Sequence, residues 1–326
     1  MIRFEGASKT YPGQVRPALD EFDLTVEAGT TCVLIGPSGC GKSTALQMVN
    51  RLVAPSAGRV LVEGRDVAGL DPISLRRGIG YVLQGVGLFP HRTVAQNVAT
   101  VPGLLGWDRR RIAGRVDAML DLVGLDPGEV RDRRPDALSG GQRQRVGVAR
   151  ALAADPPVLL MDEPFGAVDP VARARLQDEV RGILARLGKT VLMVTHDLDE
   201  AVRMGDTVAL MRGGRLVQAA PPDKLLAAPA DAFAAEFVGT DRWLRRLALL
   251  PARDYAEPVP AHDHAEPEPE SAGAAAPRLD PGASLKDALS LMLASGQAQV
   301  GVEGGRVTLA SLRRAAGAAP AEAPPA

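Results

Sequence analysis

A glycine-rich stretch near the N-terminus has the residue types needed to hold phosphate groups. It reads GPSGCGKST over residues 36–44 and fits the spacing G-x-x-x-x-G-K-[ST], between the apolar run TTCVLIG and the helical pattern STALQMVNRL. The glycines let the backbone curl so that its N–H groups converge on phosphate oxygens, assisted by the positive end of the following helix. Lys42 supplies a point charge for the β- and γ-phosphates, and the Ser43 hydroxyl is a ligand for Mg²⁺.

This loop therefore predicts an ATP site with Mg²⁺, whereas the alternative is a glycine-rich turn at the start of a helix. The same loop contains Cys40, which either fills space or acts as a reactive thiol, because a helix N-terminus lowers the pKa of a cysteine. The residues expected to contact nucleotide are Gly36, Pro37, Ser38, Gly39, Cys40, Gly41, Lys42, Ser43 and Thr44.

Polar side chains end three further apolar runs. VLLMDEP carries Asp162 and Glu163, GIGYVLQ ends at Gln84, and VLMVTH ends at His196. Because ligands bind at the carboxyl ends of parallel strands, we expect these side chains near the phosphates. Asp162 is placed to hold Mg²⁺, Glu163 to polarise the attacking water, and His196 to reach the γ-phosphate. The alternatives are a solvated Asp-Glu cap and a structural histidine.

A second glycine-containing stretch, LSGGQRQR over residues 138–145, has no lysine and no obvious metal ligand. Ser139 is expected to cap the helix that begins GGQRQRVGVARALA. The stretch would then present a second helix N-terminus that attracts anions without a lysine.

The rhythm of the chain predicts an α/β domain from residue 1 to about 240. Short apolar runs alternate with amphipathic helical stretches, which favours a largely parallel sheet covered on both faces. The clearest strands are residues 30–36, 78–84, 157–163 and 190–196. Residues 93–154 carry consecutive helical patterns and no convincing strand, so we expect a helical subdomain inserted into the sheet domain.

The C-terminal part of the chain changes in composition. Residues 241–280 include AEPVPAHDHAEPEPESAGAAAP, which predicts a linker, although His262 and His264 within it are potential metal ligands. Residues 281–315 contain a helical pattern, Leu285 to Met292, and a hairpin around Gly304 and Gly305. Residues 316–326 are expected to be a frayed tail.

Composition excludes several function classes. The formal net charge of −1 gives no support for general affinity to nucleic acid, so none is expected as a partner. Cys32 and Cys40 are too few for a zinc site and read as reduced thiols of a cytosolic protein. The N-terminus lacks the apolar core of a signal peptide and no apolar run is long enough to cross a bilayer, so at a membrane another chain would do the crossing.

These motifs, in their order and spacing, resemble the ATP-binding cassette (ABC) ATPases over residues 1 to about 240. The resemblance implies a P-loop NTPase fold and a homodimer in which the LSGGQ helix of one copy faces the γ-phosphate bound by the other.

The resemblance also implies roles for single residues. It implies that Gln84 senses Mg²⁺ and the attacking water, which gives Ser43, Gln84 and Asp162 as the metal residues. It further implies that Tyr11 stacks on adenine and that Asp169 crosses the dimer interface, beside Val168 where leucine is usual. The signature residues are Ser139, Gly140, Gly141 and Gln142.

Longer stretches, such as LRRGIGYVLQGVGLFPHRTVAQNVATVPGLLGW, look like the importers of quaternary ammonium osmoprotectants: glycine betaine, carnitine, choline or proline betaine. This resemblance implies a peripheral ATPase on the cytoplasmic side of the plasma (inner) membrane, a transmembrane permease that docks after Gln84, and an extracytoplasmic solute-binding protein. Gln96 replaces a glutamate often seen at its position. Residues 284–314 resemble part of a cystathionine-β-synthase (CBS) motif, a small α+β fragment with either a regulatory role or a packing or dimer-contact role.

Three other functions fit some or all of the motifs. An ABC importer ATPase for another small solute, such as an amino acid, fits the same core motifs. A soluble ABC protein of DNA repair or translation predicts long coiled-coil insertions or two cassettes in one chain, and neither is seen. A monomeric P-loop kinase or GTPase leaves LSGGQ unexplained.

Overall fold

The computed structural model describes residues 1–85, 87–166, 168–258 and 277–316. The chain folds as two units, Met1–Pro222 and Asp223–Ala326. This division differs from the expected boundary near residue 240, because the helices α10 (Pro222–Ala227) and α11 (Ala232–Val238) fall almost entirely in the second unit. The larger unit contains the glycine loop, the polar strand ends and the LSGGQ stretch.

The larger unit is built on a six-stranded sheet in the order β10-β9-β3-β8-β7-β6. The four strands expected from the sequence are β3 (Thr31–Ile35), β6 (Ile79–Val82), β7 (Val158–Asp162) and β8 (Thr190–Val194). They pair in parallel, β9 (Thr207–Arg212) pairs in parallel with β3, and β10 (Arg215–Ala220) adds an antiparallel edge. Because β3 and β8 are buried along their whole length, the prediction of an α/β fold with a covered parallel sheet is confirmed.

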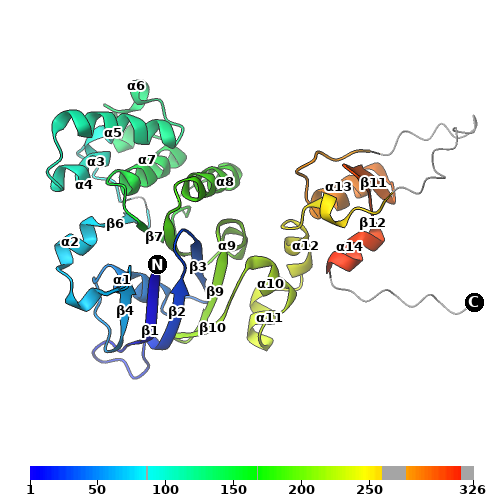
Figure 1. Cartoon of the computed structure of the whole chain (residues 1–326), viewed down its shortest axis with the longest axis horizontal. Helices are drawn as coiled ribbons and strands as arrows, with labels where there is room; N and C mark the ends of the chain where they lie inside the picture. Colours follow the sequence, from blue (N-terminus) through cyan, green and yellow to red (C-terminus); the bar gives the residue numbers. More distant parts are fainter. Residues whose placement is uncertain (86, 167, 259–276, 317–326) are drawn as a thin grey trace, which may run out of the picture. The chain divides into compact units, whose positions relative to one another are not determined.

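Helices follow the central strands directly. α1 (Lys42–Val49) comes after β3, α8 (Pro170–Arg186) after β7, and α9 (Leu198–Met204) after β8. Figure 1 labels β3, β7, α1, α8 and α9 within the larger unit. The connections from β3, β7 and β8 all leave at the carboxyl edge of the sheet, which is where α/β sheets bind their ligands.

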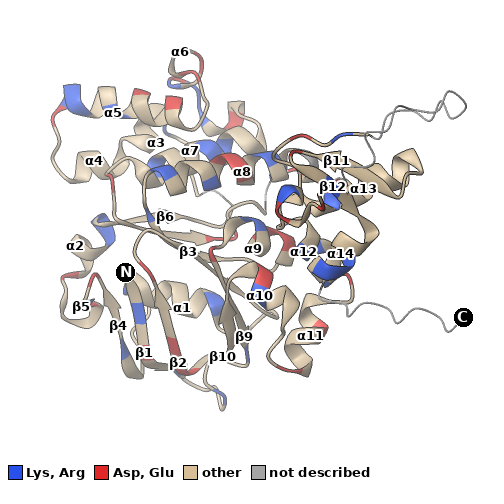
Figure 2. Ribbon diagram, turned by 45° about the vertical axis from the view of Figure 1, so that its right-hand side comes forward, with Lys and Arg blue, Asp and Glu red and all other residues tan. Residues whose placement is uncertain are grey.

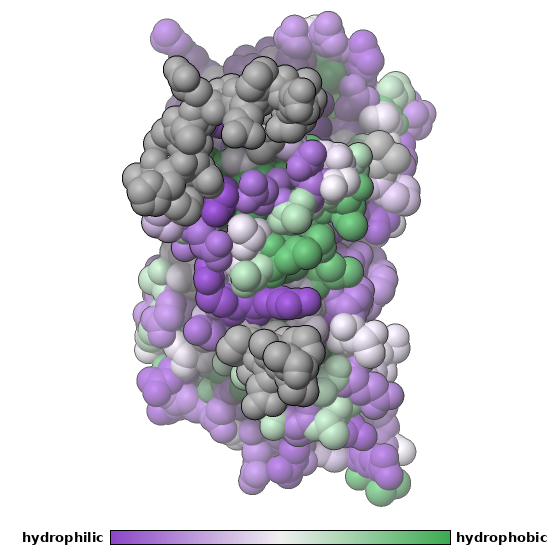
Figure 3. Space-filling model, turned by 90° about the vertical axis from the view of Figure 1, so that its right-hand side faces the viewer, coloured by the Kyte–Doolittle hydropathy of each residue, from purple (hydrophilic) through white to green (hydrophobic). Residues whose placement is uncertain are grey.

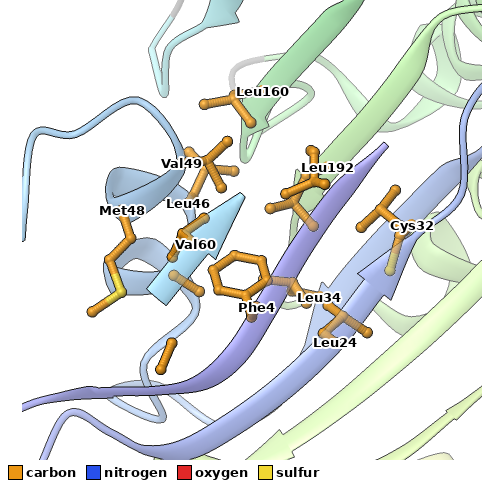
Figure 4. Close-up of a cluster of buried hydrophobic side chains, with 14 of the residues drawn as sticks. Phe4, Leu24, Cys32, Leu34, Leu46, Met48, Val49, Val60, Leu160 and Leu192 are labelled. Carbon is orange, nitrogen blue, oxygen red and sulfur yellow. The ribbon is translucent and has the colours of Figure 1, made fainter. Parts of the chain in front are cut away.

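A second sheet was not predicted from the sequence. It is antiparallel, with the order β2-β1-β4-β5, and consists of β2 (Leu19–Val26), β1 (Ile2–Lys9), β4 (Ala57–Val62) and β5 (Arg65–Asp66). Its inner side chains pack with α1 and the central sheet in one apolar cluster, where Phe4, Val60, Leu46 and Leu192 lie together (Figure 4). This cluster fixes α1 between the two sheets, and therefore fixes the loop that precedes α1.

The regular elements within residues 94–152 are all helices. These are α3 (Val94–Val98), α4 (Thr100–Leu104), α5 (Arg109–Leu122), α6 (Pro127–Val130), a 3₁₀ turn (Pro135–Ala137) and α7 (Gly140–Leu152). Several begin at a side-chain cap, as at Thr93, Asp108 and Ser139. In Figure 1 α3, α5, α6 and α7 lie together, and a further short helix, α2 (Pro72–Arg77), precedes β6.

The smaller unit corrects the expectation of a linker over residues 241–280. Residues 242–255 form α12 (Arg242–Leu247) and a 3₁₀ helix (Ala252–Tyr255), because Leu247 and Ala252 are buried in the same core as the later helices. Glu257 continues this packing through backbone hydrogen bonds with Arg306 in both directions. Residues 259–276 of the proposed linker, including His262 and His264, lie outside the described residues, as does the tail after Ala316.

The rest of the smaller unit is α13 (Leu285–Ser295), the antiparallel hairpin β11 (Gln299–Val302) and β12 (Gly305–Thr308), and α14 (Leu309–Ala316). The hairpin turns at Gly304, whose φ of +85° favours glycine. Large apolar side chains of this unit that remain exposed include Leu244, Leu293 and Leu309. Figure 3 shows hydrophobic side chains gathered on one face of the molecule within a hydrophilic surround. Whether residues 281–315 are a CBS-like fragment stays a prediction.

Among the described residues, none of the helices combines the length and apolarity that a bilayer crossing requires. Figure 2 shows basic and acidic residues interspersed along the elements of both units. Cys32 and Cys40 are both buried with free thiols, and burial raises the pKa of Cys32 to about 12. Cys32 is therefore unreactive packing in β3.

Candidate nucleotide-binding site

The glycine loop between β3 and α1 has a backbone that only glycine allows. Gly36 and Gly41 have φ of +147° and +103°, within the region that disfavours other residues. A Cβ atom at Gly41 would lie 2.2 Å from the Ala18 carbonyl oxygen, and one at Gly36 would lie 2.3 Å from the Met211 carbonyl oxygen. Within the described residues, no side chain caps the N-terminus of α1 at Gly41. The first backbone N–H groups of α1 are thus available to an anion.

Lys42 lies across this loop. Its Nζ donates hydrogen bonds to the Gly36 carbonyl oxygen at 2.7 Å and to the Pro37 carbonyl oxygen at 3.0 Å, and the residue is buried. The Cys40 sulfur is 3.7 Å from the same ammonium group. The loop therefore holds one positive charge at its centre, which suits the phosphates of a nucleotide.

A cavity of about 960 Å³ opens over the loop and is large enough for a nucleoside triphosphate. Tyr11 lines it, with its hydroxyl 3.4 Å from the Thr44 hydroxyl and its ring 5.4 Å from the Lys9 ammonium. The cavity is also lined by Ser38, Gly39, Gly41, Lys42, Ser43, Thr44, Glu163 and His196. Gly36, Pro37 and Cys40 are not among the lining residues, because Cys40 points into the core and the other two carbonyls face Lys42.

Three strand ends meet at Glu163. The Gln84 amide nitrogen donates to Glu163 Oε2 at 3.1 Å, and His196 Nδ1 lies 3.2 Å from Glu163 Oε1. Glu163 itself has a left-handed φ of +43°, and its N–H donates to the Val194 carbonyl oxygen at 2.9 Å. A non-glycine residue in this conformation costs energy and is typical of functional sites. The parallel register of β7 and β8 brings these groups together, as expected from the sequence.

The adjacent Asp162 is half-buried at the end of β7. Burial raises the pKa of the Asp162 carboxyl above its ordinary value, the Glu163 carboxylate raises it further, and the Lys42 ammonium opposes this rise. Asp162, the Ser43 hydroxyl and the Gln84 amide offer oxygen donors only, which is the ligand chemistry that Mg²⁺ prefers. The donor chemistry of these residues therefore suits Mg²⁺, and of the three Ser43 lines the cavity while Asp162 and Gln84 do not.

The LSGGQ stretch stands apart from this cavity. Ser139 caps α7, with its hydroxyl oxygen accepting from the Gln142 N–H at 3.2 Å and Gln142 Oε1 accepting from the Ser139 N–H at 3.0 Å. Asp169 caps α8 in a similar way, accepting from the Ala172 N–H at 3.0 Å. The described residues that line the cavity include none of the signature residues and not Asp169.

Several lining residues were missed by reasoning from the sequence. They belong to the turn after β1, namely Gln14, Val15, Arg16, Pro17 and Ala18, and to the β9–β10 turn at Gly213. No motif marks these positions. The only available signal was the small-residue pair Gly213-Gly214, of which Gly214 packs its backbone against Ala18.

Comparison with known proteins identifies the class. The profile of the family described as ABC transporter matches residues 19–166. The chain is 50% identical over 260 residues to the osmoprotectant import ATP-binding protein OsmV of Salmonella typhimurium, covering 79% of this chain and 68% of that protein. It is 46% identical over 297 residues to the glycine betaine uptake system ATP-binding protein YehX of Escherichia coli, covering 91% and 92%.

Among solved structures, a dimeric ATP-binding cassette in a post-hydrolysis state with ADP and phosphate bound is 31% identical. It has a TM-score of 0.60 and covers 68% of this chain and 98% of that one. The chain belongs to the ABC transporter family and is an ATP-binding ATPase of that family. The match to YehX spans more residues than the larger unit contains, so it extends into the smaller unit as well.

Proposed function

We propose that this protein hydrolyses ATP to power import of a quaternary ammonium osmoprotectant through a partner permease. The observation that carries the hydrolytic part is the contact of Gln84 and His196 with Glu163 beside the glycine loop. The substrate class is supported by the relatives, since OsmV and YehX are named for osmoprotectant import and glycine betaine uptake. The individual solute is set by the permease and the binding protein.

In this proposal the larger unit holds ATP by its phosphates. The uncapped start of α1 and the Lys42 ammonium neutralise the β- and γ-phosphates, and Tyr11 stacks on the adenine. Glu163 accepts a proton from the attacking water, while Gln84 and His196 hold its two carboxylate oxygens in place. His196 also reaches the γ-phosphate, where charge develops during the reaction.

Ser43, Asp162 and Gln84 would hold Mg²⁺ in this site. A bound Mg²⁺ ion offsets negative charge on the phosphate oxygens. The rise in the pKa of Asp162 reflects a carboxylate placed in partly buried surroundings next to Glu163, where a cation would favour its ionised form.

The site in one copy is incomplete without a second copy in this proposal. Ser139 and the N-terminus of α7 line no part of the cavity of their own chain, so they are available to a triphosphate held by another copy. Asp169 would lie at the same interface. Two copies close on two ATP molecules, and hydrolysis reopens them while the permease alternates its access. The protein would work at the cytoplasmic face of the inner membrane, with a solute-binding protein on the other side.

The test replaces Glu163 by glutamine, which keeps the shape of the side chain but removes its basicity. Turnover of ATP by Glu163→Gln should fall by roughly a thousandfold, because general base catalysis contributes about 10²–10⁴ in rate. Nucleotide should still bind, and the variant should accumulate as an ATP-loaded dimer in light scattering. Glu129→Gln, at an exposed glutamate of α6, is the matched control and should keep normal turnover.

Normal turnover in Glu163→Gln would remove Glu163 from its assigned role. Substrate class is tested separately, by co-reconstituting the chain with its permease and binding protein and measuring ATP-dependent uptake of labelled glycine betaine. Uptake of an amino acid in place of betaine, carnitine and choline would support a different importer.

A further inference from the structure

Glu200 is a buried carboxyl group that the proposed reaction does not use. It lies in the first turn of α9 and is 6% exposed. Its Oε2 accepts a hydrogen bond from the Thr195 hydroxyl, but its Oε1 is buried without a hydrogen-bond partner among the described residues. A buried polar atom left unpaired costs free energy, so its presence calls for an explanation.

Thr195 connects Glu200 to the turn that carries His196. The Thr195 hydroxyl also accepts from the Asp197 N–H at 3.1 Å, and the Thr195 N–H donates to the Leu34 carbonyl oxygen at 3.2 Å. Asp197 Oδ1 accepts in turn from the Glu200 N–H at 3.2 Å. The residues on both sides of His196 are therefore held by one small network that ends at Glu200.

Arg173, in the first turn of α8, extends this network toward Asp169. Its Nη2 donates to the Val168 carbonyl oxygen at 2.9 Å, and its Nη1 lies 4.0 Å from Asp197 Oδ2. The Arg173 Nε is buried without a hydrogen-bond partner in the described part of the chain. An incompletely paired cation and an incompletely paired carboxyl group thus occupy neighbouring first turns of α8 and α9.

The charges around Glu200 come from few elements. Burial raises the pKa of Glu200 to about 7, and Asp197 also raises it, while the Thr195 hydrogen bond, Arg173 and His196 lower it. α8 contributes Arg173 and the preceding turn contributes His196 and Asp197, whereas β3, which α9 also packs against, has no charged side chain. When Glu200 is ionised, its negative charge attracts the Arg173 guanidinium.

We propose that ionised Glu200 is a positioning residue for ATP hydrolysis, which holds the His196 turn through Thr195 and the Val168–Asp169 segment through Arg173. The inference rests on the proposed roles of Glu163 and His196. The buried carboxylate of a hydrolytic triad also orients a histidine without touching substrate, there by a direct hydrogen bond and here through Thr195. Protonation of Glu200 removes the attraction and loosens both segments.

The experiment compares Glu200→Gln with the wild-type full chain, measuring ATP turnover from pH 5.5 to 9 and the melting temperature. Glutamine keeps the size of the side chain but cannot ionise. Above pH 7 we expect kcat of Glu200→Gln to be below that of the wild type by up to about tenfold, because small displacements of a positioned group carry large rate effects. The KM for ATP should stay within about twofold of the wild-type value. Wild-type kcat should fall as the pH drops through about 7, and this limb should be absent from Glu200→Gln. The melting temperature should stay equal or rise, because a buried charge has been removed.

A second pair of variants tests the link to His196. Thr195→Val removes the hydroxyl at nearly constant volume and should lower kcat in the same direction, whereas Thr195→Ser keeps the hydroxyl and should retain at least half of wild-type kcat. A Glu200→Gln chain with unchanged kcat and an unchanged pH profile would overturn the inference. A loss of kcat that follows a lower melting temperature in Glu200→Gln would also overturn it, since that outcome marks a structural role alone.

Glu163→Gln measured alongside separates the two proposals. If Glu163→Gln turns over ATP normally, the proposed function fails. If Glu163→Gln is inactive but Glu200→Gln is fully active, only the present inference fails.

Discussion

The two helix N-termini that follow glycine stretches are built differently. α1 begins at Gly41, in a left-handed conformation with no side-chain cap among the described residues, next to the buried Lys42. α7 begins at Ser139 with a complete capping box, and the Gln142 N–H is already bonded. The start of α1 lines the 960 Å³ cavity of its own chain, and the start of α7 does not.

In the proposed dimer, this difference divides a phosphate site into two halves. A terminus that must hold a polyanion alone needs free N–H groups and a cation, and α1 has both. A terminus that is exposed until a second copy arrives is better satisfied by its own cap, and α7 is satisfied in this way. The predictions that follow test this contrast one position at a time.

The largest contrast is expected between alanine at Gly41 and alanine at Gly141. In Gly41→Ala the new Cβ would lie 2.2 Å from the Ala18 carbonyl oxygen, and the alanine backbone would have to adopt a φ of +103°. The clash and the strain together should cost about 3 kcal/mol or more of stability and abolish ATP binding. A Cβ at Gly141 meets nothing within 4 Å, so Gly141→Ala should stabilise the helix by about 0.5–1 kcal/mol. Turnover should nevertheless fall in Gly141→Ala if a second copy's triphosphate lies there. Denaturant unfolding measures the stability of both variants, and an ATP turnover assay on the same samples measures their activity.

The next contrast concerns the cations of the two termini. Lys42→Ala removes the ammonium group from the loop and should weaken ATP binding by roughly 30- to 100-fold, because a charged hydrogen bond contributes about 2–3 kcal/mol. Arg143, in the first turn of α7, donates to the Leu138 carbonyl, so Arg143→Ala should change the Kd of ATP by less than about threefold in dilute protein. Titration with a fluorescent ATP analogue measures the Kd of both variants. Equal losses of affinity would contradict the separation of the two termini.

The smallest difference in stability between two compared variants is expected from the caps. Ser139→Ala should cost about 1 kcal/mol and lower turnover, while leaving the affinity of the dilute chain for ATP unchanged. Ser284→Ala is the matched control, because Ser284 caps α13 with the same 3.2 Å hydrogen bond from a backbone N–H. Its stability cost should be similar and its turnover normal. Loss of turnover in both variants would assign the effect of Ser139→Ala to folding alone.

Much of this arrangement was predictable because it depends on local chemistry. The glycine loop, the apolar strands and the polar strand ends at Glu163 and His196 follow from spacing and from the rule that parallel strands bind ligands at their carboxyl ends. The cap at Ser139 follows from a hydroxyl placed before a helical pattern. The catalytic and binding roles of these residues stay predictions.

The rest depended on contacts between distant segments. The antiparallel sheet around Phe4 has bulged registers that break the alternation of apolar residues, which hides β1 in the sequence. The cavity wall at Val15 and Arg16 has no motif of its own. The supposed linker at residues 242–255 folds because a few apolar side chains, among them Leu247, meet a core supplied by α13 and α14. Glu200 carries no motif, because its burial depends on the packing of α9 against α8 and β3.

The most direct test asks where Ser139 lies when ATP is bound. One sample of the Glu163→Gln chain carries Ser139→Cys and a second carries Ser38→Cys, at an exposed position of the glycine loop. The two are mixed with and without ATP and Mg²⁺ under mild oxidation, and the linked peptides are identified by mass spectrometry. We expect a disulfide between the two chains that forms only with ATP. If ATP produces no link between these positions, or if the link forms equally without it, the α7 terminus does not complete the nucleotide site of a second copy.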